Sequence, residues 1–109
     1  MPSNSKNWTA SGPDGISLVT STTSTVTQIC TTDSAAMARD VMIENRGASD
    51  VYVKTGSASN ITATSLSLRV PAGQYRIFEK GMTGGVANTY LAYLAASGTP
   101  QIVVYLGEG

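Results

Sequence analysis

The chain has 109 residues, in which seven Lys and Arg balance seven Asp and Glu, so the formal net charge is zero. This length suits one compact domain and is too short for two of ordinary size. A neutral chain lacks the cationic excess with which proteins bind nucleic acid or anionic membrane surfaces. We therefore expect a single domain whose partners are neither nucleic acid nor membrane.

The cysteine content and the N-terminus indicate where the protein is made. Cys30 is the only cysteine, so no intrachain disulfide can form. Small secreted domains often depend on disulfides, and their absence favours folding in a reducing cytosol. The N-terminus lacks the apolar segment of a signal peptide, and no apolar run approaches the roughly 18 residues of a transmembrane helix. The sequence thus predicts a soluble protein made in the cytoplasm.

Residues 1–15 are polar and rich in Ser, Asn, Gly and Pro, and they end in the helix- and strand-breaking run 11–15. Trp8 is the only large apolar side chain in this segment. We expect an extended N-terminal arm over residues 1–15, followed by a folded domain over residues 16–109. A lone Trp in a polar arm either packs on its own domain or docks on a neighbour, so Trp8 is a candidate partner-binding residue.

After the arm, apolar and polar residues alternate with period two, and helical periodicity is absent. Charged residues make up 13% of the chain, about half of the typical ~25%, and the Ser and Thr that replace them suit pleated strands. Residues 33–38 could form one helical turn or a loop, and the Gly-rich residues 80–89 are predicted to be a flexible loop. Strands are predicted at residues 16–20, 26–29, 39–45, 51–55, 66–70, 75–79, 90–96 and 101–106. So many short strands predict an all-β fold, a single antiparallel β-sandwich or a jelly-roll-like barrel.

Two of these strands, 39–45 and 51–55, are separated by the turn sequence at 46–50 and predict a β-hairpin. Val51 and Val53 would point into the core and Tyr52 away from it. We therefore expect Tyr52 to be exposed, and it is the second candidate partner-binding residue.

The sequence offers no equipment for catalysis. Histidine is absent, which removes the commonest general base and zinc ligand. No nucleotide-binding or nucleophile motif occurs, and Cys30 has no cationic neighbour in sequence that would activate its thiol. We expect no enzyme activity, no catalytic residues, no cofactor and no metal, and we interpret Cys30 as a small, partly buried residue.

Four further tyrosines lie on predicted strands where either face could be the core: Tyr75, Tyr90, Tyr93 and Tyr105. In small sandwiches such aromatic residues usually pack in the core or at subunit contacts, although a β-face of aromatic residues can also stack on sugars or bases.

Several segments resemble the small virion proteins of tailed bacteriophages that decorate or cement the head. The resemblance covers roughly residues 36–109. It rests on residues 41–47 (VMIENRG), 51–53 (VYV), 54–56 (KTG), 70–73 (VPAG), 96–99 (ASGT) and 104–109 (VYLGEG).

The resemblance implies a non-enzymatic structural protein on the capsid surface of the virion, with the major capsid protein as partner. It also implies many copies per particle and a homo-oligomer, with a trimer favoured. The alternative is a carbohydrate- or receptor-binding β module of a phage tail fibre or spike, which would use exposed Tyr and Trp. A cupin-like enzyme is a third reading, and the missing histidines argue against it.

Overall fold

The computed structural model describes residues 9–10, 15–30 and 40–108, and these ranges contain eleven β-strands and no helix. In chain order the strands are β1 (Thr9–Ala10), β2 (Ile16–Val19), β3 (Thr25–Gln28), β4 (Asp40–Asn45), β5 (Val51–Gly56), β6 (Leu68–Val70), β7 (Tyr75–Glu79), β8 (Met82–Thr83), β9 (Val86–Ala87), β10 (Tyr90–Ala95) and β11 (Gln101–Glu108).

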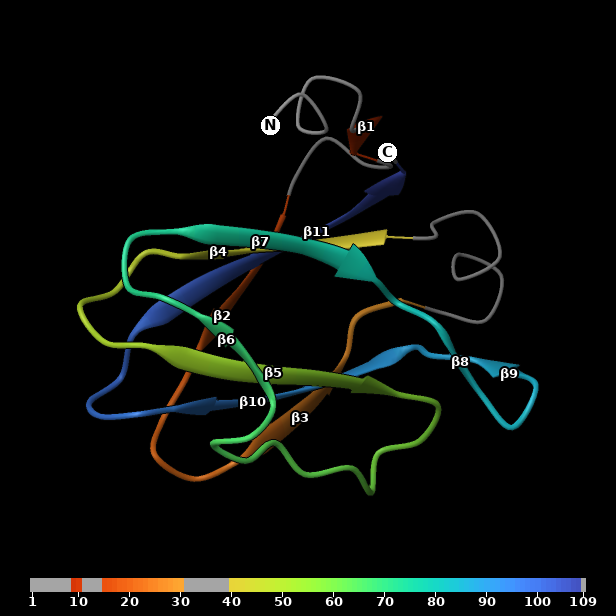
Figure 1. Cartoon of the computed structure of the whole chain (residues 1–109), viewed down its shortest axis with the longest axis horizontal. Helices are drawn as coiled ribbons and strands as arrows, with labels where there is room; N and C mark the ends of the chain where they lie inside the picture. The colour runs from red at the N-terminus through yellow and green to blue at the C-terminus, as the bar shows by residue number, and fades with distance from the viewer. Residues whose placement is uncertain (1–8, 11–14, 31–39, 109) are drawn as a thin grey trace.

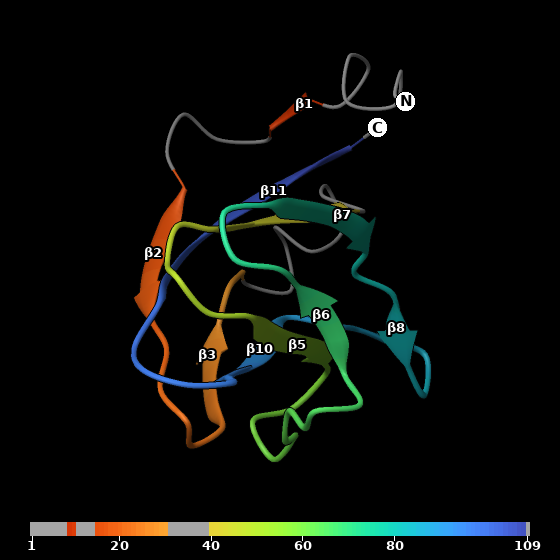
Figure 2. The same ribbon diagram turned by 60° about the vertical axis from the view of Figure 1, so that its left-hand side comes forward.

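Two antiparallel sheets stack face to face (Figures 1 and 2). The five-stranded sheet has the order β1-β11-β4-β7, and β2 also pairs with β11. The four-stranded sheet has the order β3-β10-β5-β6. Apart from the β1–β2 and β5–β6 connections and the small β8–β9 hairpin, each connection carries the chain from one sheet to the other. This is the strand order of a jelly roll, and it confirms the predicted all-β sandwich.

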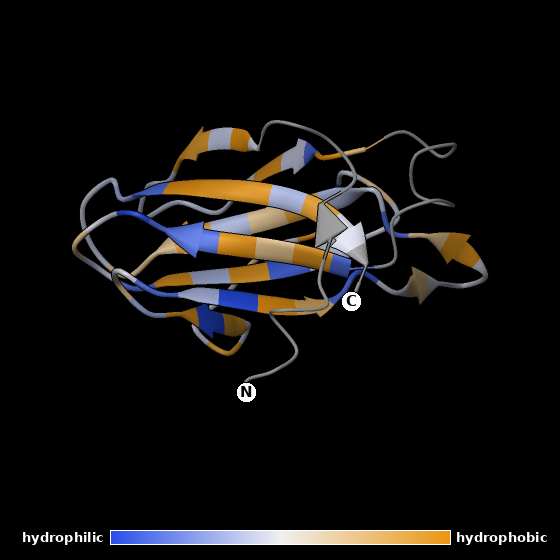
Figure 3. Ribbon diagram, turned by 90° about the horizontal axis from the view of Figure 1, so that it is seen from above, coloured by the Kyte–Doolittle hydropathy of each residue, from blue (hydrophilic) through white to orange (hydrophobic). Residues whose placement is uncertain are grey.

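The core lies between the sheets, where alternate residues of the central strands point inward. In β4, for example, Val41 and Ile43 are fully buried, whereas Met42 and Glu44, which alternate with them, are only partly buried. The same alternation of apolar and polar residues is visible along the strands in Figure 3. The buried cluster comprises Ile29, Cys30, Val41, Ile43, Val51, Val53, Val70, Leu91, Tyr93, Ile102 and Val104.

The predicted hairpin of β4 and β5 is wrong. β4 pairs with β11 and β7, whereas β5 pairs with β10 and β6 in the other sheet. Residues 46–50 therefore cross between the sheets instead of turning within one. The alternation correctly placed Val51 and Val53 inward, because burial depends on the face of a strand and not on which strand lies beside it.

Asn45, the last residue of β4, holds this crossing in place. Its side chain is buried, and Nδ2 donates to the carbonyl oxygens of Ser49 (2.8 Å) and Val70 (3.0 Å). Its Oδ1 accepts a hydrogen bond from the Gly47 amide (2.9 Å). The main chain of Asn45 also bonds to the β6–β7 turn, through Gly73 and Gln74. One buried amide thus links both crossings at this end of the sandwich.

Two further expectations for loops had different outcomes. The predicted turn after β6 is confirmed, since Gly73 has a φ of 74° and the amide of Gln74 donates to the Pro71 carbonyl (3.1 Å). The predicted flexible loop at 80–89 is wrong in part, because it contains the β8–β9 hairpin. The possible helical turn at 33–38 lies outside the described residues.

The predicted arm is described only at residues 9–10 and 15. Thr9 and Ala10 form β1, which pairs with Glu108 and Gly107 and so lengthens the five-stranded sheet. Gly15, just before β2, lies against the outer face of that sheet. A Cβ atom there would collide with Val103 Cγ1 and come within 2.8 Å of the Tyr105 ring, so a larger residue would have to displace these two side chains.

Candidate functional site

The two sequence-predicted contact residues are not brought together as one described site. Trp8 lies outside the described residues. Tyr52 lies on β5 with its side chain on the outer face of the four-stranded sheet, where it is half-buried between Arg69 and Leu94 of the adjacent strands. Its orientation agrees with the predicted alternation, but the expectation that it is exposed is wrong in part, because the side chains of the adjacent strands cover half of it. Its role in partner binding stays a prediction.

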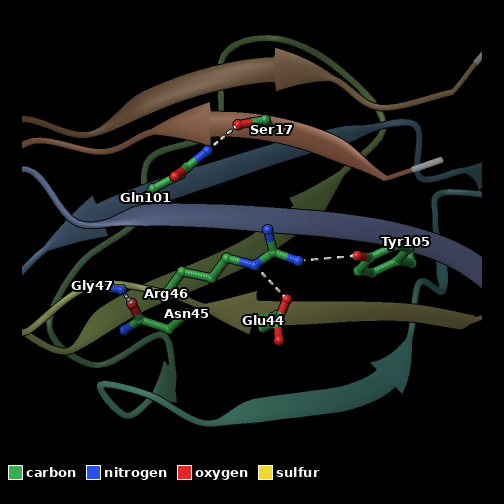
Figure 4. Close-up of polar contacts among 7 residues, drawn as sticks. All are labelled: Ser17, Glu44, Asn45, Arg46, Gly47, Gln101 and Tyr105. Carbon is green, nitrogen blue, oxygen red and sulfur yellow. Dashed lines mark hydrogen bonds and ion pairs between the residues drawn. The ribbon is translucent and has the colours of Figure 1, made fainter.

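The outer face of the five-stranded sheet carries a polar cluster of Glu44, Arg46 and Tyr105 (Figure 4). Arg46 Nε donates to Glu44 Oε1 at 2.7 Å, and its terminal nitrogen lies 3.5 Å from the Tyr105 hydroxyl. The hydrogen bond to Glu44 raises the pKa of Arg46 above its already high ordinary value, so the guanidinium stays charged. Tyr75 lies opposite Glu44 on β7 and is 47% exposed. Two aromatic rings, a cation and a carboxylate therefore share this face.

Of the other tyrosines, Tyr93 is a core residue. It is 3% exposed, and its hydroxyl lies 2.7 Å from Thr27 Oγ1 on the neighbouring strand β3. Tyr90, on the same strand, points to the outer face and is partly buried. This hydrogen bond gives the hydroxyl of the buried Tyr93 a partner on the partly buried Thr27.

Cys30 is buried just after β3, as predicted. Burial raises the pKa of its thiol, and the nearby charge of Lys80 opposes this effect without outweighing it. The thiol is therefore neutral near pH 7 and a weak nucleophile. Sequence reasoning missed Lys80 as a neighbour because the two residues are brought together only by the fold.

An open pocket of about 370 Å³ lies at one end of the sandwich, between residues 47–49 and 97–101. The two loops that form the pocket pack closely together, since a Cβ atom on Gly47 would lie 2.5 Å from the Cα atom of Pro100. The carbonyl of Pro100 accepts hydrogen bonds from both the amide and the hydroxyl of buried Thr20, and Ser49 Oγ donates to the Ser97 carbonyl. The lining residues carry no charge.

The β8–β9 hairpin lies at the opposite end, clear of the two sheets (Figures 1 and 3). Its turn residues Gly84 and Gly85 both have positive φ, 59° and 80°, the conformation of a two-residue hairpin turn. Met82 is 66% exposed and Val86 49% exposed. Sequence reasoning missed these residues, although a Gly-Gly pair between Thr83 and Val86 was a recognisable turn signal.

Further large apolar side chains are exposed along the margins of the sheets. Val19 (68%) lies on β2 at one side of the sandwich. On the other side, Leu68 (42%) belongs to the edge strand β6, and Leu66 (94%) lies in the turn before it. Edge strands with exposed apolar residues are open to pairing with another chain.

Two other kinds of site are absent from the described part of the chain. Within residues 9–10, 15–30 and 40–108, no three His, Cys, Asp or Glu side chains gather where they could hold a metal ion. The same ranges contain no helix that is long and apolar enough to cross a membrane.

No protein-family model and no curated protein matches the sequence. Two solved structures are similar at low identity. Hydroxypropylphosphonic acid epoxidase from S. wedmorenis, in complex with fosfomycin, aligns with a TM-score of 0.44 and 15% identity over 86% of this chain and 44% of its own, so this chain spans less than half of its length. The SPBc2 prophage-derived protein YomS aligns with a TM-score of 0.46 and 11% identity over 92% of this chain and 98% of its own. Neither likeness is close enough to assign a function.

Proposed function

We propose that this protein is a non-enzymatic structural component of a bacteriophage virion. In this proposal it lies on the capsid surface, decorates or cements the shell, and contacts the major capsid protein and further copies of itself. The sequence resemblance supplies the biological setting. The observation that carries the proposal is the set of large apolar side chains left exposed at the margins of a small domain: Val19, Leu66, Leu68, Tyr75, Met82 and Val86.

Exposed apolar residues at several margins support repeated protein–protein contact because each margin can meet a different neighbour. Zero net charge leaves little repulsion between copies packed closely on a shell. The jelly roll itself contributes a rigid body whose loops and edges keep fixed relative positions.

The test is the composition of purified virus particles. Particles from the host that makes this protein would be banded on a density gradient and analysed by quantitative mass spectrometry. We expect the chain to band with the major capsid protein at many copies per particle, and antibodies against it to label the outside of the head. Recovery of the chain only in the soluble fraction of the lysate, with none on particles, would contradict the proposal.

A second candidate is a carbohydrate- or receptor-binding module. The observation that favours it is the shared face of Tyr75, Tyr105, Glu44 and Arg46, since sugar sites combine aromatic rings with carboxylates and hydrogen-bond donors. A glycan array with the wild-type chain and Tyr75→Ala tests it. Binding that Tyr75→Ala abolishes supports this function, whereas no binding to any glycan removes the sugar-binding form of it.

A further inference from the structure

The two edge strands on one side of the sandwich carry no charge. β2 pairs only with β11 and β3 only with β10, so within the described residues each strand has one open edge. Both lie on the same side of the molecule, and β6 and β7 lie on the other (Figure 2). Residues 15–30, which include β2 and β3, contain no Asp, Glu, Lys, Arg or Pro. Charged residues and proline are what usually keep an edge strand from pairing with another chain, and β2 and β3 have neither.

The edge strands on the other side are protected in this way. Arg69 is the middle residue of the three-residue strand β6, and its side chain is 61% exposed. A twofold axis through β6 would therefore place two arginines side by side, which opposes the pairing of two copies there even though Leu68 is exposed. β7 carries Arg76 and Glu79. The distribution of charge thus leaves β2 and β3 as the edges that a second copy can approach.

The main-chain groups of Ser17 and Val19 point to the open edge of β2. The amide of Thr20 donates to the Pro100 carbonyl (3.0 Å), which continues the register of β2 and β11. Opposed residues of antiparallel strands alternate between hydrogen-bonded and non-hydrogen-bonded pairs, so Leu18 also bonds to β11. The amides and carbonyls of Ser17 and Val19 then face away from the sheet, in the direction of a further strand.

Of the two open edges, β2 offers more to a partner. Val19 is 68% exposed, and its burial against another chain is favourable. The exposed side chains of β3 are those of Thr25 and Gln28, which are polar. In addition, the loop after β5 reaches the start of β3, where the Ala63 amide donates to Ser24 Oγ (2.9 Å). The contact is therefore expected at β2.

We propose that the β2 strands of two copies pair antiparallel about a twofold axis, so that the two five-stranded sheets become one. With Leu18 of both copies on the axis, Ser17 of each copy lies opposite Val19 of the other. Each of these pairs exchanges main-chain hydrogen bonds, and the outward groups of both residues gain partners. Such an isologous contact closes with two copies, so it specifies a dimer where the sequence resemblance implies a trimer. The inference rests on the proposed contact between copies and specifies the strand that makes it.

The experiment uses the full chain and the symmetry of the contact. In the proposed register the two Val19 side chains are diagonal neighbours across the axis, a separation that long side chains can span. Val19→Lys and Val19→Glu each bring like charges together, whereas an equal mixture of the two variants brings opposite charges together. Val86→Lys is the matched control, because Val86 is 49% exposed on β9, away from β2. Melting temperatures equal to wild type show that the variants are folded, and sedimentation velocity over a range of concentrations measures association.

We expect the wild type and Val86→Lys to form dimers. Each Val19 variant alone should dimerise roughly tenfold more weakly or less, the factor that 1.4 kcal/mol gives. The equal mixture should recover dimer formation, and added salt should reduce the difference between the mixture and the single variants, because salt screens exposed charges. A wild type that is monomeric at every concentration or trimeric, a mixture that recovers nothing, or a loss in Val86→Lys as large as in Val19→Lys would each overturn the proposal.

Virus particles separate this inference from the proposed function. If the chain is present on particles in many copies but the Val19 variants associate in solution as the wild type does, only the β2 contact is refuted. If the dimer responds to the Val19 variants as expected but the chain is absent from particles, only the role in the virion is refuted.

Discussion

The buried amide of Asn45 gives the sharpest test of how the two sheets are joined. Replacing Asn45 with Ala removes three side-chain hydrogen bonds, two to the carbonyl oxygens of Ser49 and Val70 and one from the Gly47 amide. The change therefore leaves polar main-chain groups without partners at the point where the chain crosses between sheets.

The size of the effect follows from how deeply each partner is buried. The Val70 carbonyl lies in a buried bond, whereas the bonds to Ser49 and Gly47 are partly buried and water can reach them. A polar group left unsatisfied in the interior costs about 1–3 kcal/mol. Taking the upper value for one bond and the lower for two, we expect a loss of about 5 kcal/mol, a large share of the ~5–15 kcal/mol that stabilises a typical domain.

The assay is urea unfolding of the isolated chain, followed by circular dichroism, with thermal melting as a second measurement. Asn60→Ala is the matched control, because Asn60 is exposed in the loop after β5, and it should change the unfolding free energy by less than about 0.5 kcal/mol. Asn45→Asp keeps the size and the acceptor for the Gly47 amide but loses both donated bonds. It should lie near Asn45→Ala and far from the control.

An unfolding free energy for Asn45→Ala within about 1 kcal/mol of wild type would refute this reasoning, since such a value is typical of an average substitution. It would mean that water or a shifted main chain satisfies the three partners, and that the crossing is held by packing of the sheets alone.

Three other changes test separate parts of the molecule. Tyr93→Phe removes the partly buried hydrogen bond to Thr27 and should cost about 1 kcal/mol in urea unfolding, so an unchanged midpoint would show that the bond contributes nothing. Burial raises the pKa of the Cys30 thiol in the folded chain. The stability that the neutral thiol contributes is therefore complete below its ordinary pKa of 9.0 and falls as the pH rises past that value. Cys30→Ser should flatten this decline of stability with pH, and equal declines in both proteins would exclude the thiol as the cause. Trp8→Ala should leave the melting temperature of the isolated domain nearly unchanged and weaken assembly measured by sedimentation, as expected of an aromatic anchor. A lower melting temperature with intact assembly would instead place Trp8 in the core of its own domain.

Part of the candidate site was predictable and part was not. Tyr52 was correctly assigned to the outer face, because alternation with Val51 and Val53 decides which way a strand residue points. The pocket at one end of the sandwich was not predictable. The pocket forms between residues 47–49 and 97–101, which are distant in the chain, and nothing in either segment alone indicates the other.

The same division applies to the polar cluster on the five-stranded sheet. Glu44 and Arg46 are two residues apart, and their proximity could be read from the chain. Tyr105 joins them only because β11 lies beside β4, and Tyr75 only because β7 lies on its other side. Sequence periodicity carries no information on which strand becomes a neighbour.

The sequence by itself determined the all-β class, the approximate positions of the strands in the described ranges and the faces that they bury. These properties follow from local preferences, the period of two and the turn residues, as at Pro71 and Gly73. Only the tertiary structure decided that β4 and β5 belong to different sheets. A short turn between two alternating strands satisfies the local rules for a hairpin and for a crossing equally well, and the choice depends on the long-range bonds of Asn45 and on the strands that flank it.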